Sequence, residues 1–221
     1  MTPARPRGED AIPVPVESAL DSRGGDTASP ETPGPALYAA LDLGTNSCRM
    51  LIAQPKGSQF LVADSFSKTV QLGAGLEGSG RLSRASMART IQALRICQKK
   101  IEKHGVRRMR LVATEACRRA RNARDFIRQV RRETGLVLEI IAPEEEARLA
   151  VISCAPLVSA RTEQLLVVDI GGGSTELVWI DLAEVAPEDR PRAIMRLHSG
   201  FQAQGAGPAA RVVDWISVPL G

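Results

Sequence analysis

The sequence predicts an α/β protein, and two observations lead to this prediction. Short, nearly continuous apolar runs of the length of buried strands recur along residues 36–220. Between them lie segments whose apolar residues have helical spacing and whose ends carry capping residues. The order of these segments predicts one complete βββαβαβα lobe plus the start of a second lobe.

The N-terminal segment is predicted to lie outside any core. Residues 1–36 hold seven of the fourteen prolines, with Gly, Ser, Asp and Glu between them, and such a composition cannot bury a core. We therefore expect a disordered extension at 1–36, a first lobe at 37–160 and an incomplete second lobe at 161–221.

The first lobe is predicted to open with three strands and a helix. Strands are predicted at 36–43, 48–54 and 59–72, close enough in sequence to form a meander. A glycine-rich loop at 73–82 follows. Ser83 then predicts the start of a helix with an apolar stripe at 3.6-residue spacing, and Gly105 predicts its end.

Strands and helices alternate in the rest of this lobe. Strands are predicted at 108–114 and 136–142. Residues 115–134 are predicted to be helical, in two pieces with Asn122 as an internal cap. Pro143 suits the first position of a further helix, whose early glutamates favour the positive end of the helix dipole.

A second unit follows, made of strands and one long connection. Strands are predicted at 165–170, 175–182 and 212–220. Residues 183–210 are rich in Pro, Gly, Ala and Arg, and we predict a loop insertion there.

The charge distribution favours a polyanionic partner or a solvated helix face. The net charge is only +4, but residues 99–132 hold thirteen Lys and Arg against three acids. Aromatic residues make up 3% of the chain, too few for the stacking platforms of single-strand nucleic-acid readers, so no specific nucleic-acid partner is expected.

Cysteine usage and hydropathy predict a cytoplasmic protein. The four cysteines are far apart and form no C-x-x-C pair, which favours reduced thiols over a zinc site or a disulfide frame. No apolar stretch has the length of a membrane span, so no membrane partner is expected.

The most informative stretch is the glycine turn at 168–178, which reads VDIGGGSTELV. It is not a dinucleotide fingerprint, because its glycines are consecutive and a strand follows, and it lacks the lysine of a P-loop. The stretch LDLGTNSCRMLI at 41–52 has the same order of residue types. Two such strand–Asp-x-Gly–strand units suggest two lobes that face each other, with backbone N–H groups near an anion.

Six ordered motifs resemble one known family. DLGTNSCR, LGAGLEGSGRLS, VATEACRRARN, EEEARL, VDIGGGSTEL and SVPLG together are similar to the exopolyphosphatase/guanosine pentaphosphate phosphatase (Ppx/GppA) family, over residues 37–181 and 213–221. The resemblance implies a ribonuclease H-like (actin-like ATPase) fold. It also implies a phosphoanhydride hydrolase that releases terminal phosphate from polyphosphate, guanosine pentaphosphate, or both.

Such a hydrolase must neutralise phosphate charge, position water and provide a base. The glycine turns offer N–H groups, their serines and threonines offer hydroxyls, and two arginines match phosphate oxygens. The candidate substrate-binding residues are Gly44, Thr45, Asn46, Ser47, Arg49, Arg118, Gly171, Gly172, Gly173, Ser174 and Thr175.

The resemblance implies Glu146 as the catalytic base. Its position in the first turn of a helix after a core strand supports that role independently, whereas Glu144 and Glu145 fit a helix-dipole role. Asp42 and Asp169 are expected on the side of a Mg²⁺ ion, with Glu176 in the same metal shell.

Alternative interpretations remain open at this point. The chain fits, less well, an ATP-binding kinase or ATPase of the same superfamily, or a truncated module that binds polyphosphate without turnover. We expect it to be a fragment or a truncated product, since SVPLG leads on into more of the second lobe in the family. A homodimer is expected for the full-length form.

Overall fold

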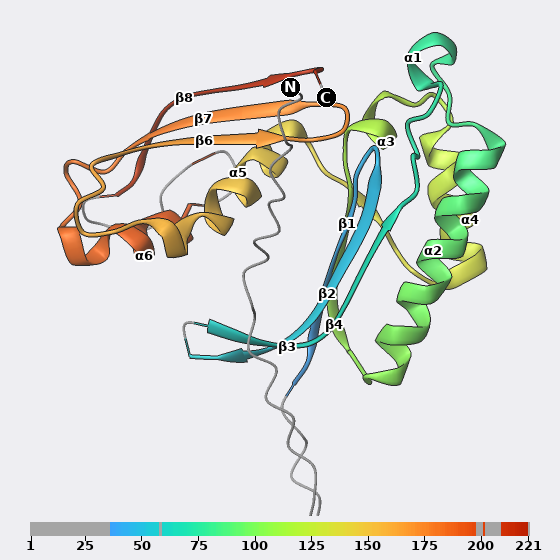
Figure 1. Ribbon diagram of the computed structural model, residues 1–221, viewed down its shortest axis with the longest axis horizontal. Helices are drawn as coiled ribbons and strands as arrows, with labels where there is room; N and C mark the ends of the chain where they lie inside the picture. Colours follow the sequence, from blue (N-terminus) through green and yellow to red (C-terminus); the bar gives the residue numbers. More distant parts are fainter. Residues whose placement is uncertain (1–35, 58, 198–200, 202–208, 221) are drawn as a thin grey trace, which may run out of the picture. The chain divides into compact units, whose positions relative to one another are not determined.

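The computed structural model describes residues 36–57, 59–197, 201 and 209–220 (Figure 1). The extension predicted at 1–36 falls, apart from Ala36, outside the described residues. Residues 35–221 form one compact unit by their contacts, so the predicted lobe boundary at residue 160 stays a prediction. Within the described parts, no helix is both long and apolar enough to cross a membrane.

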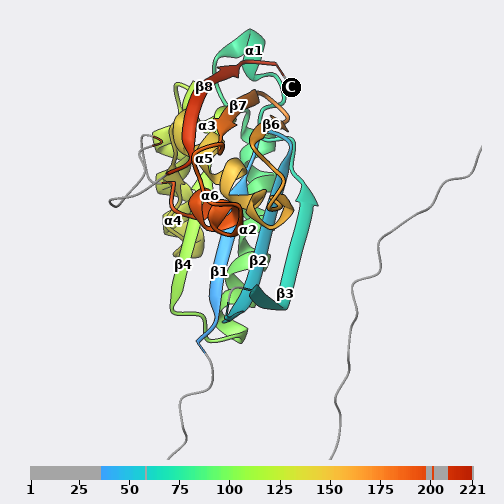
Figure 2. The same ribbon diagram turned by 90° about the vertical axis from the view of Figure 1, so that its left-hand side faces the viewer.

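A five-stranded sheet forms the first half of this unit, in the order β3-β2-β1-β4-β5. The strands are β1 (Tyr38–Leu43), β2 (Ser47–Lys56), β3 (Gln59–Thr69), β4 (Arg108–Ala113) and β5 (Glu139–Ile140). The first three pair antiparallel, as the predicted meander requires, and β4 pairs parallel to β1. Figure 2 shows β4, β1, β2 and β3 side by side.

The fifth strand is much shorter than predicted. The prediction covered 136–142, but only two residues pair with β4. Leu136 and Leu138 are buried in the core cluster, and the Ile141 N–H donates to the Ala113 carbonyl at 3.1 Å. The apolar run is therefore explained by packing of an extended segment against the core, without a full strand ladder.

Four helices belong to this half: α1 (Leu76–Ser79), α2 (Arg84–Lys103), α3 (Glu115–Arg119) and α4 (Ala123–Thr134). The Ser83 hydroxyl caps α2 by accepting the Ser86 N–H at 3.1 Å, as predicted. The loop predicted at 73–82 contains the one-turn helix α1, which two left-handed glycines, Gly75 and Gly80, bracket. Helices α2 and α4 lie next to each other on one side of the sheet (Figure 1).

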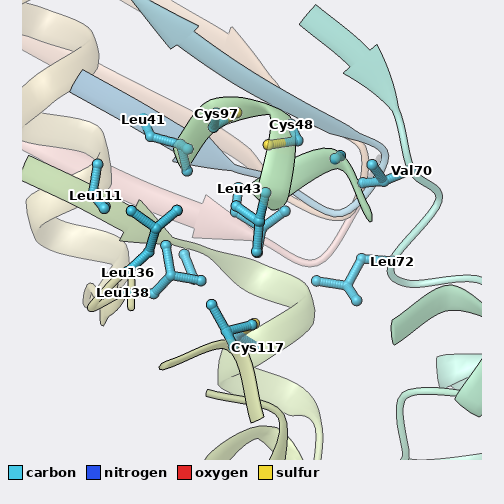
Figure 3. Packing of buried hydrophobic residues seen from close by; sticks show 14 of the residues in the cluster. Leu41, Leu43, Cys48, Val70, Leu72, Cys97, Leu111, Cys117, Leu136 and Leu138 are labelled. Atoms are coloured by element: carbon cyan, nitrogen blue, oxygen red, sulfur yellow. The ribbon is translucent and has the colours of Figure 1, made fainter. Parts of the chain in front are cut away.

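Successive side chains of the central strands point to opposite faces of the sheet, and this separates core residues from charged ones. Leu41 and Leu43 of β1 and Cys48 of β2 are buried in the helix-covered core (Figure 3). Asp42 and Arg49 alternate with them, pair across β1 and β2, and therefore lie on the opposite face of the sheet. Burial of the leucines thus places the charged pair away from the core.

Asn122 separates α3 from α4 and holds the N-cap position of α4, as predicted, but its side chain does not cap the helix. Within the described chain its side chain makes no capping bond to α4. Instead its amide accepts the Leu82 N–H at 2.8 Å and donates to the Leu82 carbonyl at 3.0 Å, both in a buried setting. The side chain therefore ties the start of α4 to the segment before α2.

We expect Asn122→Ala to lower the free energy of unfolding by about 2–3 kcal/mol, because it leaves two buried backbone groups of Leu82 without partners. Urea unfolding measures this. The control is Gln98→Ala, whose amide bonds Glu102 on an exposed surface and whose loss should cost within about 0.5 kcal/mol. Equal effects of the two substitutions would contradict the bridging role.

A three-stranded antiparallel sheet, in the order β6-β7-β8, forms the second half. The elements here are α5 (Pro143–Ser153), the 3₁₀ turns η1 (Ala155–Leu157) and η2 (Pro187–Asp189), α6 (Arg190–Met195), β6 (Gln164–Ile170), β7 (Thr175–Asp181) and β8 (Arg211–Val218). The strand–turn–strand reading of VDIGGGSTELV is confirmed.

Two features of this half differ from the prediction. Ala147 and Val151 of α5, a helix assigned to the first lobe, are buried in the same cluster as Val167 and Val178 of the second sheet. The predicted loop at 183–210 contains η2 and α6, and Ile194 is fully buried in that cluster. The physical reason is that the few apolar residues of this Pro- and Arg-rich segment cover the second sheet.

Candidate functional site

A cavity of about 330 Å³ lies where the two glycine turns meet. Two hairpins, β1–β2 and β6–β7, supply most of its wall, and the first residues of α3 and α5 supply the rest. Its lining residues are Asp42, Gly44, Thr45, Asn46, Ser47, Arg49, Thr114, Glu115, Glu146, Asp169, Ile170, Gly171, Gly172, Gly173 and Ser174. Most of the sequence-predicted site residues are in this set.

Each of the two turns is closed by the same kind of backbone hydrogen bond. The Gly44 N–H donates to the Ser47 carbonyl at 2.9 Å, and the Gly171 N–H donates to the Ser174 carbonyl at 2.8 Å. The equivalence that the sequence suggested between LDLGTNSCRMLI and VDIGGGSTELV is thus present in the backbone of both turns.

The turns approach each other so closely that a side chain on the second one would displace side chains around it. A Cβ atom on Gly172 would lie 2.5 Å from Asn46 Nδ2, and one on Gly173 would lie 2.6 Å from Thr45 Oγ1. Contacts this short do not occur for real Cβ atoms. The consecutive glycines therefore let the second turn pack directly on the side chains of the first.

Glu146 lies in the first turn of α5 and faces the cavity. Its Oε2 atom accepts a hydrogen bond of 2.6 Å from Arg118 Nη1. Burial raises the pKa of the Glu146 carboxyl above its usual value, and the Arg118 guanidinium opposes that rise. Burial with one cationic partner is the environment that brings a carboxylate base toward neutral pH.

The neighbouring Glu145 has the opposite electrostatic environment. It accepts hydrogen bonds from Arg148 and Arg110 at 2.7–2.8 Å, and these arginines lower the pKa of its carboxyl to about 2. The negative charge of Glu145 therefore forms ion pairs with two arginines. The sequence predicted only an interaction with the helix dipole.

Asp42 and Asp169, the two expected metal-side residues, both line the cavity, and their role at a metal stays a prediction. Burial raises the pKa of the Asp42 carboxyl, Arg49 opposes this, and the charge of Asp169 adds to the rise. Two like charges that repel each other are a suitable setting for a divalent cation. Among the described residues, however, no group of three or more His, Cys, Asp or Glu side chains has the geometry to hold a metal ion.

Three predicted site residues do not line this cavity. Arg118 lies behind Glu146 and Glu115 and bonds both carboxylates. The Thr175 hydroxyl donates to the Leu220 carbonyl at 2.7 Å. Glu176 is 1% exposed and accepts a hydrogen bond from the Ser217 hydroxyl at 2.8 Å.

Sequence reasoning assigned no role to three residues of the cavity wall, Thr114, Glu115 and Ile170. Thr114 and Glu115 are the first two residues after β4, a strand that pairs parallel to β1 and so ends beside Asp42 and Leu43. The signal that would have found them is this position at the carboxyl end of a predicted central strand.

Known proteins share both the sequence pattern and the fold. The Ppx/GppA phosphatase family model matches residues 51–198. The chain is similar to the Ppx/GppA family member of Aquifex aeolicus, with 34% identity over 84% of this chain and 52% of that chain and a TM-score of 0.62. It is also similar to an exopolyphosphatase from Cytophaga hutchinsonii, with 21% identity over 84% of this chain and 51% of that chain and a TM-score of 0.67.

These matches confirm the predicted fold class. The second likeness, at 21% identity, concerns the fold alone. The chain spans about half the length of the solved structures that it matches.

Proposed function

This chain belongs to the Ppx/GppA phosphatase family, and on that premise we propose that it releases terminal orthophosphate from inorganic polyphosphate, from guanosine pentaphosphate, or from both. The observation that carries the proposal is the single cavity in which both glycine turns, Asp42, Asp169 and Glu146 meet. Membership of the Ppx/GppA phosphatase family supports phosphate release as the reaction.

The two turns would hold the terminal phosphates. They bring backbone amides and the hydroxyls of Thr45, Ser47 and Ser174 to one cavity wall. Arg49 adds a guanidinium at the same wall, which matches phosphate oxygens in shape and charge. Because catalysis of phosphoryl transfer is mostly positioning and charge stabilisation, this wall supplies the main requirement.

Glu146 would accept the proton of the attacking water. Its carboxylate faces the cavity and is held by Arg118 Nη1, so one oxygen is oriented while the other can accept a hydrogen bond. The raised pKa of this carboxyl brings its proton affinity closer to neutral pH, where a base is most effective.

The residues present fit a Mg²⁺ ion. This ion needs only one or two protein carboxylates, keeps several waters and completes its shell with substrate phosphates, which matches the pair Asp42 and Asp169. When bound, Mg²⁺ would neutralise charge on the phosphates. We include Glu176, which pairs with Asp169 across β6 and β7, in this proposal only as a buried carboxylate.

The proposal is tested by measuring phosphate release from polyphosphate and from guanosine pentaphosphate by the full-length protein, with Mg²⁺ and with a chelator. We expect release that depends on Mg²⁺ from at least one substrate. ATP serves as the comparison, since preferential turnover of ATP would favour the kinase or ATPase alternative. Binding of polyphosphate without release of phosphate from any substrate would overturn the hydrolase proposal.

The rate of phosphate release should fall on acidification. The midpoint of this fall should lie at a higher pH than it would for a catalytic glutamate with an ordinary pKa. Burial raises the pKa of Glu146, the base works only as the carboxylate, and protonation therefore removes activity as the pH drops through that raised value. Asp42, whose pKa burial also raises, adds to the same acidic limb. A pH–rate profile measures this, and a midpoint at or below the usual glutamate value would contradict it.

A further inference from the structure

Glu115 is a second acidic residue in the wall of the cavity. It is the first residue of α3 and lies two residues after the end of the central strand β4. Its side chain is only 14% exposed, close to the 18% of Glu146. A carboxylate this far withdrawn from water needs a partner, and its closest partner is Arg118, with Arg119 Nε farther away at 3.8 Å.

Arg118 is held from two sides. Glu115 Oε2 accepts hydrogen bonds from its Nε at 3.1 Å and its Nη2 at 2.9 Å. On the other side, Nη1 donates to the Ile141 carbonyl at 3.0 Å and to Glu146 Oε2 at 2.6 Å. The guanidinium thus lies between the two carboxylates.

Little of the Arg118 guanidinium remains for a phosphate. A guanidinium has five N–H donors, and the bonds within the described chain occupy four of them. This arrangement favours a role for Arg118 in orienting Glu146, with direct phosphate contact left mainly to Arg49.

Glu115 is itself fixed by the second glycine turn. Its Cγ atom would lie 3.3 Å from a Cβ atom on Gly173, so the stem of the side chain packs beneath that turn. The Glu115 side chain is therefore attached to α3 at its backbone end and packed against the glycine turn along its aliphatic part. A constrained anchor of this kind transmits its position to Arg118 through two hydrogen bonds.

We propose that Glu115 is a positioning residue, which holds the Arg118 guanidinium so that Nη1 orients the carboxylate of Glu146. This inference rests on the proposed function of Glu146 as the base. It makes Glu115 and Arg118 one unit, so that loss of either should disturb Glu146 to a similar extent without removing a substrate contact.

The kinetic test uses Glu115→Gln in the full-length protein. We expect kcat to fall on the order of 10–100-fold, since small misplacements of a catalytic group cost this much, while KM does not rise. Glu115→Asp keeps a carboxylate and should restore part of the lost kcat. In an Arg118→Lys background, Glu115→Gln should add less than about a twofold further loss, because the unit is already broken.

Glu144→Gln is the matched control, because Glu144 lies in the same turn of α5 as Glu146 and accepts no described bond from Arg118. It should leave kcat nearly unchanged. Additive losses from the Glu115 and Arg118 substitutions, or a raised KM with an unchanged kcat, would overturn the positioning role.

A second measurement does not depend on activity. The Arg118 Nε–H proton should exchange slowly with water in the wild type because Glu115 accepts its hydrogen bond, and Glu115→Gln should accelerate that exchange. Arg118→Lys identifies the NMR signal. If this signal behaves as expected in a protein that releases no phosphate, the proposed function fails while the Glu115–Arg118 contact stands; unchanged exchange in the variant overturns the inference itself.

Discussion

Glu146→Gln should lower kcat for phosphate release on the order of 10²–10⁴-fold, the range over which a positioned base contributes. The amide keeps the shape of the side chain but does not accept a proton from water. The KM should change little, because the two glycine turns and Arg49, which are expected to bind the phosphates, stay in place. Steady-state measurement of phosphate release gives both constants.

The folded state should tolerate this substitution. The raised pKa of Glu146 means that its ionised form is less favourable in the folded chain than in the unfolded chain. Its contribution to stability is therefore fully present below the unfolded pKa and is lost as the pH rises through the raised folded pKa. A neutral Gln avoids that loss, so thermal unfolding at neutral pH should show no decrease in Tm.

Glu144→Gln is again the control, since it removes one charge from the same helical turn. Comparable losses of kcat in Glu144→Gln and Glu146→Gln would indicate a general effect of charge on the cavity and would contradict the assignment of the base.

Gly173→Ala should reduce kcat/KM for phosphate release by about 10²-fold, comparable to the loss of one preorganised donor in a catalytic site. The added Cβ would lie 2.6 Å from Thr45 Oγ1 and 3.3 Å from Glu115 Cγ. The Thr45 and Glu115 side chains would have to move or the two turns would have to separate, and either change displaces donors from their common target. Phosphate-release kinetics test the activity, and binding of a non-hydrolysable polyphosphate analogue tests the affinity.

Gly78→Ala is the matched control for this prediction. It adds the same methyl group, but a Cβ at Gly78 meets no atom of the described chain within 4 Å. Thr45→Ala combined with Gly173→Ala removes the nearest clashing atom and should recover part of the activity. If the double variant is no better than Gly173→Ala, close packing of the two turns is not the reason for the loss.

Local patterns predicted most of the elements. The Ser83 cap, the helix that follows it and the strands on both sides of each Asp-Gly turn come from neighbouring residues, and all are present in the structure. These features depend on period and capping, which are properties of a few consecutive residues. On β1 the alternation of buried and exposed residues appears only in the structure, because the sequence there is a nearly continuous apolar run.

Other features depend on partners that are far away in the sequence. Residues 136–142 have the pattern of a strand, yet only two residues of β5 pair with β4. Leu136 and Leu138 are apolar because they pack in the core. The apolar residues of α5 cover the second sheet, although its place in the order suggested the first lobe. The spacing of apolar residues predicts that one face of a helix or strand is buried. It does not predict against which other element that face packs.

The sequence by itself determined the family, the order of the strands and of the main helices, and the two equivalent turns that end in Ser47 and Ser174. Only the tertiary structure decided that Arg118 lies between Glu115 and Glu146, and that the glycines of one turn pack on the side chains of the other. The physical reason is that hydrogen bonds such as that from Arg118 to Glu146 join residues 28 positions apart. Their formation depends on how sheet and helices pack, and no local pattern encodes that geometry.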